Sequence, residues 1–96
     1  MRASIRAHAS SRKLVKMPTV LRAGGYRFYF YSHEPGEPPH IHVDKDGATA
    51  KFWLERPALV RSSGFNARDL AEIFRLVNEN RPNLLESWHG FFGPER

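Results

Sequence analysis

Hydrophobic and polar residues alternate most regularly from Glu37 to Glu55, where the sequence reads EPPHIHVDKDGATAKFWLE. Asp46-Gly47 in its middle is typical of a tight hairpin turn, because both central turn residues need positive φ and these two residue types tolerate it. The pattern therefore predicts two antiparallel strands that pair outward from the turn, unless a three-residue turn slips the register by one. The predicted pairs are Lys45 with Ala48, Val43 with Ala50, His42 with Lys51, Ile41 with Phe52 and His40 with Trp53.

The two faces of this hairpin differ in character, because successive side chains of a strand point to opposite sides. The apolar face, which we assign to the core, consists of Ile41, Val43, Ala50, Phe52 and Leu54. The opposite face carries His40, His42, Lys51, Trp53 and Glu55. We expect the chemistry of the protein on this second face.

An aromatic hairpin is expected before it. Pro18 to Arg22 is a short β-rich run, Gly24-Gly25 is a turn signal, and Tyr26 to Ser32 is strand-like by its aromatic content. One face of this strand carries Tyr26, Phe28 and Phe30, and the other carries Arg27, Tyr29 and Tyr31. The second set is either half-buried packing or a platform on which bases stack.

The loop between the hairpins, Ser32 to Pro39, contains three prolines and one glycine, which exclude a helix and a central strand. It leads directly into His40. We therefore place Glu34 and Glu37 at the mouth of the histidine-bearing face.

The chain after Pro57 is expected to be mainly helical. Ala58 to Gly64 fits either a short edge strand or a turn of helix. Asn66 is a suitable N-cap with Asp69 at the third helical position. The helix predicted from Ala67 to about Asn80 has an apolar stripe of Leu70, Ile73, Phe74 and Val77.

Arg81-Pro82 is expected to end that helix and begin another, because proline disfavours a helix interior. The second helix repeats Leu84, Leu85, Trp88 and Phe92 at helical spacing, with His89 beside that stripe as helix surface or packed neighbour, and Gly93-Pro94 closes it. The prediction is an α+β fold: an antiparallel four-stranded sheet of two hairpins, followed by two C-terminal helices packed on one face.

Composition limits the class of protein. The 96 residues fit one small domain, assigned to residues 17–93 with a tail at 94–96, and the 0 cysteines exclude disulfides and thiolate chemistry. No apolar run is long enough to span a bilayer or to serve as a secretory signal, so we expect a cytoplasmic protein.

The formal net charge of +5 lies entirely in residues 1–16, since the remaining chain has equal numbers of basic and acidic residues. This leader fits a start assigned upstream of Met17, a disordered basic arm or an organellar transit peptide. A basic tail on a neutral domain is a weak signal for nucleic acid.

Several segments together resemble a small bacterial family, domain of unknown function 4160. They are the run from Met17 to Val43, AKFWLE, GFNARDLAEI and NRPNLLESWHGFFG. The resemblance implies a toxin-like component of a type II toxin-antitoxin pair, with a second small protein as partner. The positions that carry over are Glu37, Pro38, Pro39, His40, His42, Lys51 and Trp53. It supplies no catalytic assignment.

The histidine-bearing face contains what metal-independent RNA cleavage needs. His40 and His42 lie roughly 6.5 to 7 Å apart along one strand. One imidazole would remove the 2′-hydroxyl proton and the other would protonate the leaving oxygen, because histidine titrates near neutrality. Lys51 would stabilise the phosphate charge, with Glu37 beside it. The residues expected to bind RNA are Trp53, Glu34, Tyr29, Tyr31, Arg27 and His89.

Three other interpretations remain. A His-x-His pair also suits zinc, with His89, His33 or a glutamate as third ligand, but that signal is weak and we expect no metal or other cofactor. In the second interpretation the face is an ordinary solvent-facing surface, whose histidines could be removed at little cost in stability. In the third interpretation the protein is a non-catalytic binding module, and this face contacts a partner protein.

Overall fold

The computed structural model of the chain describes residues 16–31 and 36–93, and only the backbone of residues 16–18. Within these ranges five strands precede one helix, which confirms the α+β class. They are β2 (Lys16–Ala23), β3 (Tyr26–Tyr31), β4 (His40–Lys45), β5 (Ala48–Trp53), β6 (Ala58–Ser63) and α3 (Ala67–Phe92). The expectations for the leader before residue 16 and for the tail 94–96 lie outside the described residues.

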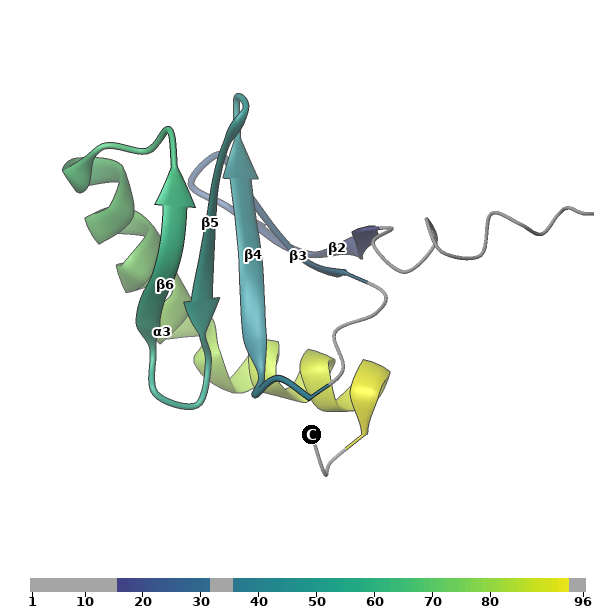
Figure 1. Cartoon of the computed structure of the whole chain (residues 1–96). Coiled ribbons are helices and arrows are strands. Elements are labelled where there is room, and N and C mark those ends of the chain that lie inside the picture. Colours follow the sequence, from purple (N-terminus) through teal and green to yellow (C-terminus); the bar gives the residue numbers. More distant parts are fainter. Residues whose placement is uncertain (1–15, 32–35, 94–96) are drawn as a thin grey trace, which may run out of the picture.

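The strands form one antiparallel sheet in the order β2-β3-β4-β5-β6, so each strand pairs with its neighbours in sequence (Figure 1). Every predicted pair between β4 and β5 is observed, from Lys45 with Ala48 to His40 with Trp53. The turn has the expected geometry, with φ 52 at Asp46 and φ 87 at Gly47. The register follows from this turn, because its length decides which side chains face the core.

The prediction of four strands is wrong by one. The undecided segment after Pro57 is strand β6, which pairs with the outer side of β5. Its register shifts between Lys51 and Phe52, so Lys51 pairs with Arg61 and Phe52 with Leu59. β6 is therefore the fifth strand, and its side chains extend both faces of the sheet.

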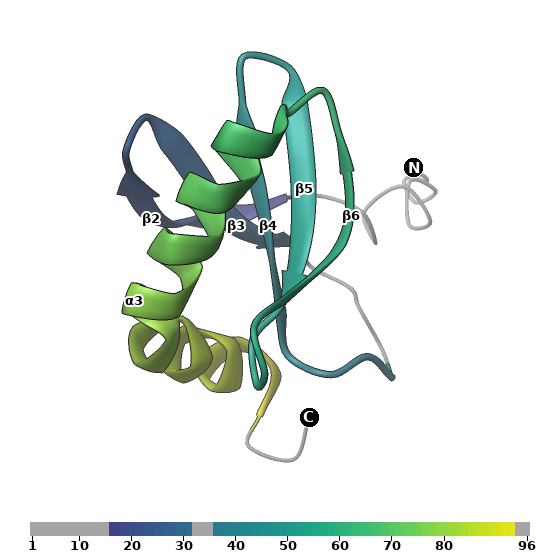
Figure 2. The ribbon, with the colours of Figure 1, turned by 90° about the vertical axis from the view of Figure 1, so that its left-hand side faces the viewer.

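The prediction of two helices separated at Pro82 is also wrong. α3 runs for 26 residues with Pro82 inside it, and its axis bends between the two halves (Figure 2). Proline removes one helical hydrogen bond and crowds the preceding turn, which bends a helix without necessarily ending it.

Both halves of α3 stay helical because both pack on the core. Its buried residues are Ile73, Leu76 and Val77 before the proline and Leu84 and Trp88 after it. Next to the bend, the Arg81 guanidinium donates hydrogen bonds of 2.7 Å each to the carbonyl oxygens of Leu54 and Glu55, at the end of β5. The bend is thereby tied to the sheet.

The helix begins as predicted. The Asn66 side chain accepts a hydrogen bond from the Asp69 backbone N–H, and the Asp69 carboxylate accepts one in return from the Asn66 backbone N–H. The predicted stripe needs one correction, since Phe74 is 42% exposed and Leu76 occupies the buried position.

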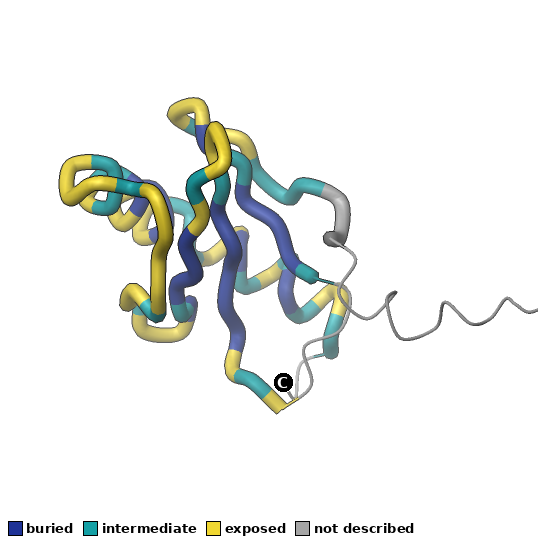
Figure 3. Tube along the Cα trace, turned by 45° about the horizontal axis from the view of Figure 1, so that its top comes forward, coloured by how far each residue is buried: buried dark blue, intermediate teal, exposed yellow. Residues whose placement is uncertain are grey.

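The core lies between α3 and one face of the sheet. It contains Tyr26, Phe28, Phe30, Ile41, Val43, Ala50, Phe52 and Leu54 of the sheet side, as the alternation predicts. Figure 3 shows that the buried residues concentrate along the central strands, whereas β6 is largely exposed. The other side of the sheet, away from α3, is called the helix-free face below.

Candidate functional site on the helix-free face

A row of four side chains crosses the helix-free face on four neighbouring strands. Tyr29 of β3 pairs with His42 of β4, His42 with Lys51 of β5, and Lys51 with Arg61 of β6. Directly paired residues of antiparallel strands have neighbouring side chains on one face. This set, Tyr29, His42, Lys51 and Arg61, is called the cross-strand row.

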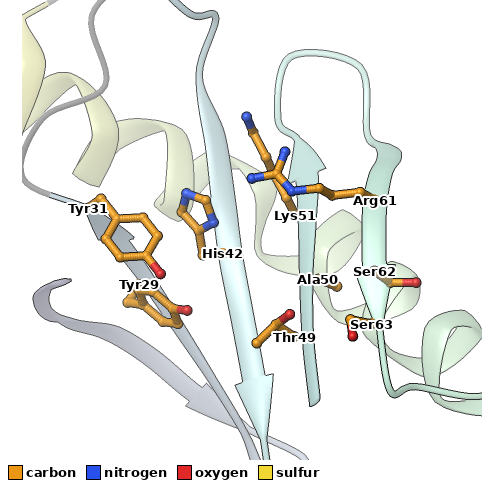
Figure 4. A pocket seen from close by; sticks show the side chains of 9 residues that line it. All are labelled: Tyr29, Tyr31, His42, Thr49, Ala50, Lys51, Arg61, Ser62 and Ser63. Atoms are coloured by element: carbon orange, nitrogen blue, oxygen red, sulfur yellow. The ribbon is translucent and has the colours of Figure 1, made fainter. Parts of the chain in front are cut away.

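A shallow cavity of about 180 Å³ opens over this row (Figure 4). It is lined by Tyr29, Tyr31, His42, Thr49, Ala50, Lys51, Arg61, Ser62 and Ser63. Figure 4 shows the two tyrosines and His42 on one side, with Lys51 and Arg61 extending toward each other on the other. The side chains at the cavity include two cations, one imidazole and the hydroxyl groups of Tyr29, Tyr31, Thr49 and Ser63, whereas Ser62 points away (Figure 4), and no carboxylate lines it. Such a set suits an anion with several oxygen acceptors.

Lys51 is paired although it is almost buried. Its ammonium lies 2.6 Å from the Glu37 carboxylate, with side-chain exposures of 7% for Lys51 and 43% for Glu37. The same ammonium lies 5.2 Å from the centre of the Trp53 ring. An ion pair and a ring face thus compensate the charge that burial would otherwise disfavour.

Glu37 reaches this position because its loop is fixed to the sheet. The Leu54 backbone N–H donates a 3.0 Å hydrogen bond to the carbonyl oxygen of Pro39, which extends the β4–β5 pairing into the loop. The prolines at 38 and 39 have fixed φ and stiffen the segment between Glu37 and the strand. The loop therefore delivers a carboxylate to Lys51 at the edge of the cavity.

His42 lies among aromatic rings at the cavity. Its imidazole stacks on Tyr29, with ring centres 5.6 Å apart and an interplanar angle of 22°, and meets the Tyr31 ring edge-on at 4.6 Å. His42 is 6% exposed. The two tyrosines thus fix the imidazole plane while leaving it a narrow opening to the cavity.

His40 is fully buried, at 0% exposure. Its Nδ1 is 2.9 Å from the carbonyl oxygen of Pro38, and its ring lies 4.8 Å from that of Trp88, in the second half of α3. That half of α3 passes across the end of the sheet where β4 begins (Figure 1). The burial of His40, His42 and Lys51 contradicts the interpretation of the histidine-bearing face as an ordinary solvent-facing surface.

Tyr29 is held in its neutral form. Burial raises the pKa of its hydroxyl above the ordinary value, and a hydrogen bond with Tyr31 raises that pKa further. Tyr29 is therefore a hydrogen-bonding hydroxyl at physiological pH and supplies no negative charge to the cavity.

The structure brings together most of the residues predicted from sequence. The contacts described above connect seven of them: Glu37, His40, His42, Lys51, Trp53, Tyr29 and Tyr31. Arg27 lies one row away, 3.5 Å from Asp44 and over the Tyr29 ring, and it does not line the cavity. His89 lies on α3, with Nδ1 3.3 Å from the carbonyl oxygen of Gly93, and does not line it either. Glu34 and His33 lie outside the described residues.

Five lining residues were not predicted as site residues: Thr49, Ala50, Arg61, Ser62 and Ser63, of which Ala50 was assigned to the core. Arg61, Ser62 and Ser63 come from β6, the segment that sequence left undecided. The available signal was the run of polar residues RSS after the Pro57 turn, which suits an edge strand that is largely exposed.

Neither a metal centre nor a membrane span is found in the part of the chain that the structure describes. No group of three or more histidine, aspartate or glutamate residues there could hold a metal ion. The described helix is not apolar enough over its length to cross a bilayer.

Fold and site define a small α+β protein whose helix-free sheet face carries a cavity lined by His42, Lys51 and Arg61. A family model, Domain of unknown function (DUF4160), matches residues 25–89, and the chain belongs to this family. No curated protein matches the chain. No solved structure matches it either.

Proposed function

We propose that this protein is a toxin-like component that acts on RNA in the cytoplasm, and that the cavity on the helix-free face binds and cleaves the RNA backbone. One observation carries the proposal: an imidazole and two cations occupy paired positions on three adjacent strands, in His42, Lys51 and Arg61. Imidazole both takes and gives protons near neutral pH, and cations stabilise the charge of a phosphate in reaction.

The reaction class is transphosphorylation without a metal. The 2′ oxygen forms a bond to phosphorus as the bond from phosphorus to the 5′ oxygen breaks, which leaves a 2′,3′-cyclic phosphate. His42 takes the 2′-hydroxyl proton, and the Lys51 ammonium gives a proton to the departing 5′ oxygen. A proton passed from His42 to Lys51, its pairing neighbour, restores both residues. Arg61 and Lys51 stabilise the charge on the phosphate oxygens.

This proposal assigns one acid-base histidine instead of two. The His40 ring is covered completely, so it cannot contact a substrate. It lies 5.1 Å from the His42 ring and edge-on to it. His40 is therefore a positioning residue whose ring packs against the ring of His42. Glu37 positions Lys51 through the ion pair between them.

The second candidate is a non-catalytic binding module, with a small antitoxin-like partner covering the helix-free face. The partly exposed aromatics Tyr31 and Trp53 and the exposed Arg61 favour it, because such residues are enriched at protein interfaces. This face would then contribute contact area and no chemistry.

Growth of a bacterial host after tightly induced expression of the full chain separates the two candidates. His42→Gln removes the acid-base group, and His89→Gln is the matched control because His89 lies on α3 away from the cavity. We expect the wild type and His89→Gln to arrest growth and folded His42→Gln not to do so. Arrest by His42→Gln would contradict the assigned chemistry, and absence of arrest in all three would favour the binding module.

A further inference from the structure

The charge of the cavity is smaller than its lining suggests. Lys51 and Arg61 each carry one positive charge, but the Glu37 carboxylate, 2.6 Å from Lys51, neutralises one of them. The Arg61 side chain forms no hydrogen bond or ion pair with the described residues, whereas its backbone belongs to the β5–β6 pairing. Lys51, Arg61 and Glu37 together therefore leave one uncompensated positive charge at the site.

A phosphodiester inside an RNA chain carries one negative charge, which matches this balance. A terminal phosphate carries about 1.5 to 2 negative charges near neutral pH. Its second charge would meet the carboxylate of Glu37 in a partly buried site, where an unmatched charge is costly. The site is thus balanced for a diester.

The size of the cavity is also compatible with an internal phosphodiester. The cavity has a volume of about 180 Å³. It can take a phosphate with part of its sugars, and the bases would extend beyond it along the sheet surface. There they would meet the partly exposed rings of Tyr31 and Trp53, which stack on bases of any kind.

We infer that the site takes an internal phosphodiester of single-stranded RNA, recognised through its backbone, and that the Glu37–Lys51 pair discriminates against terminal phosphates. The inference rests on the proposed function, since it names the substrate class of the same cavity. It makes the protein an endonuclease with little base preference.

The sharpest test compares two probes that differ by one methyl group: a 2′-deoxynucleoside 3′-phosphate and its methyl ester, neither of which has a 2′-hydroxyl to react. Their affinities for the full chain are measured by NMR titration at about pH 8, where the monoester is fully charged. We expect the methyl ester to bind at least threefold more tightly. Glu37→Gln should reverse this preference, and Arg61→Gln should weaken both probes at least fivefold, with exposed Arg68→Gln as the control.

Each result has a distinct meaning. Tighter binding of the monoester to the wild type would overturn the inference and leave action on RNA ends open. An unchanged preference in Glu37→Gln would overturn the role of the pair. Binding of neither probe would contradict both the inference and the proposed RNA site.

Discussion

The ammonium of Lys51 and the carboxylate of Glu37 lie 2.6 Å apart although one belongs to strand β5 and the other to a proline-rich loop. Lys51 is nearly buried and Glu37 is not. The pair therefore fixes the loop over the edge of the cavity, and it also sets the charge of that cavity.

Removing the carboxylate should be measurable as lost stability. Glu37→Gln leaves a nearly buried ammonium without its counter-ion, and we expect a loss of about 1 to 2 kcal/mol, reduced from the value for a fully buried pair because Glu37 is partly exposed. Urea unfolding measures this change. The double variant Glu37→Gln, Lys51→Met should lose less than the sum of the two single variants, and strict additivity would show that the contact does not stabilise the fold.

The two histidines of β4 should respond differently to substitution. His40→Ala removes a fully buried ring that packs on Trp88, and we expect it to lower the free energy of unfolding by about 2 to 4 kcal/mol. His42→Gln keeps a polar group at the cavity and should cost clearly less. Equal stability of the wild type and His40→Ala, measured by chemical unfolding, would contradict the packing described for His40.

Arg81 should matter more than a typical helix arginine. Arg81→Ala leaves two carbonyl oxygens at the end of β5 without their charged donor, so we expect a loss of about 1 to 3 kcal/mol in urea unfolding. Arg75→Ala is the control, because among the described residues Arg75 pairs with Glu72 and Glu79 on the helix surface, and its loss should change little. A similar loss of stability in both variants would mean that the two hydrogen bonds from Arg81 do not stabilise the fold.

The raised pKa of Tyr29 predicts how the stability of the fold changes at alkaline pH. The folded protein raises the pKa of this hydroxyl, so its contribution is fully present below the unfolded value of about 10 and declines as the pH rises above that value. We expect the wild type to lose thermal stability above about pH 10, and Tyr29→Phe to lose it less steeply. Parallel curves for the two proteins would be inconsistent with a buried neutral Tyr29.

The hairpin of β4 and β5 was predictable because its determinants are local. Asp46 and Gly47 adopt the positive φ that their types allow, and the turn length then fixes every pair up to His40 with Trp53. The N-cap at Asn66 was predictable for the same reason. Local hydrogen bonds and local φ preferences leave a clear mark in sequence.

The misses depend on contacts between distant segments. Pro82 should end an isolated helix, but packing of Trp88 on the core keeps the second half helical. The burial of His40 follows from that packing and from the loop at Pro38, so no sequence period signals it. Arg61 was missed because β6 was undecided, and its place in the cross-strand row depends on a register shift.

Cleavage of a defined single-stranded RNA by the purified full chain, without added metal and with a chelator present, tests the central claim most directly. We expect internal cuts that leave 2′,3′-cyclic phosphate ends, produced by the wild type and His89→Gln and at least a hundredfold more slowly by folded His42→Gln, as loss of an acid-base group implies. Equal cleavage by wild type and His42→Gln would contradict the chemistry assigned to the helix-free face, and intact RNA with all three would contradict catalysis itself.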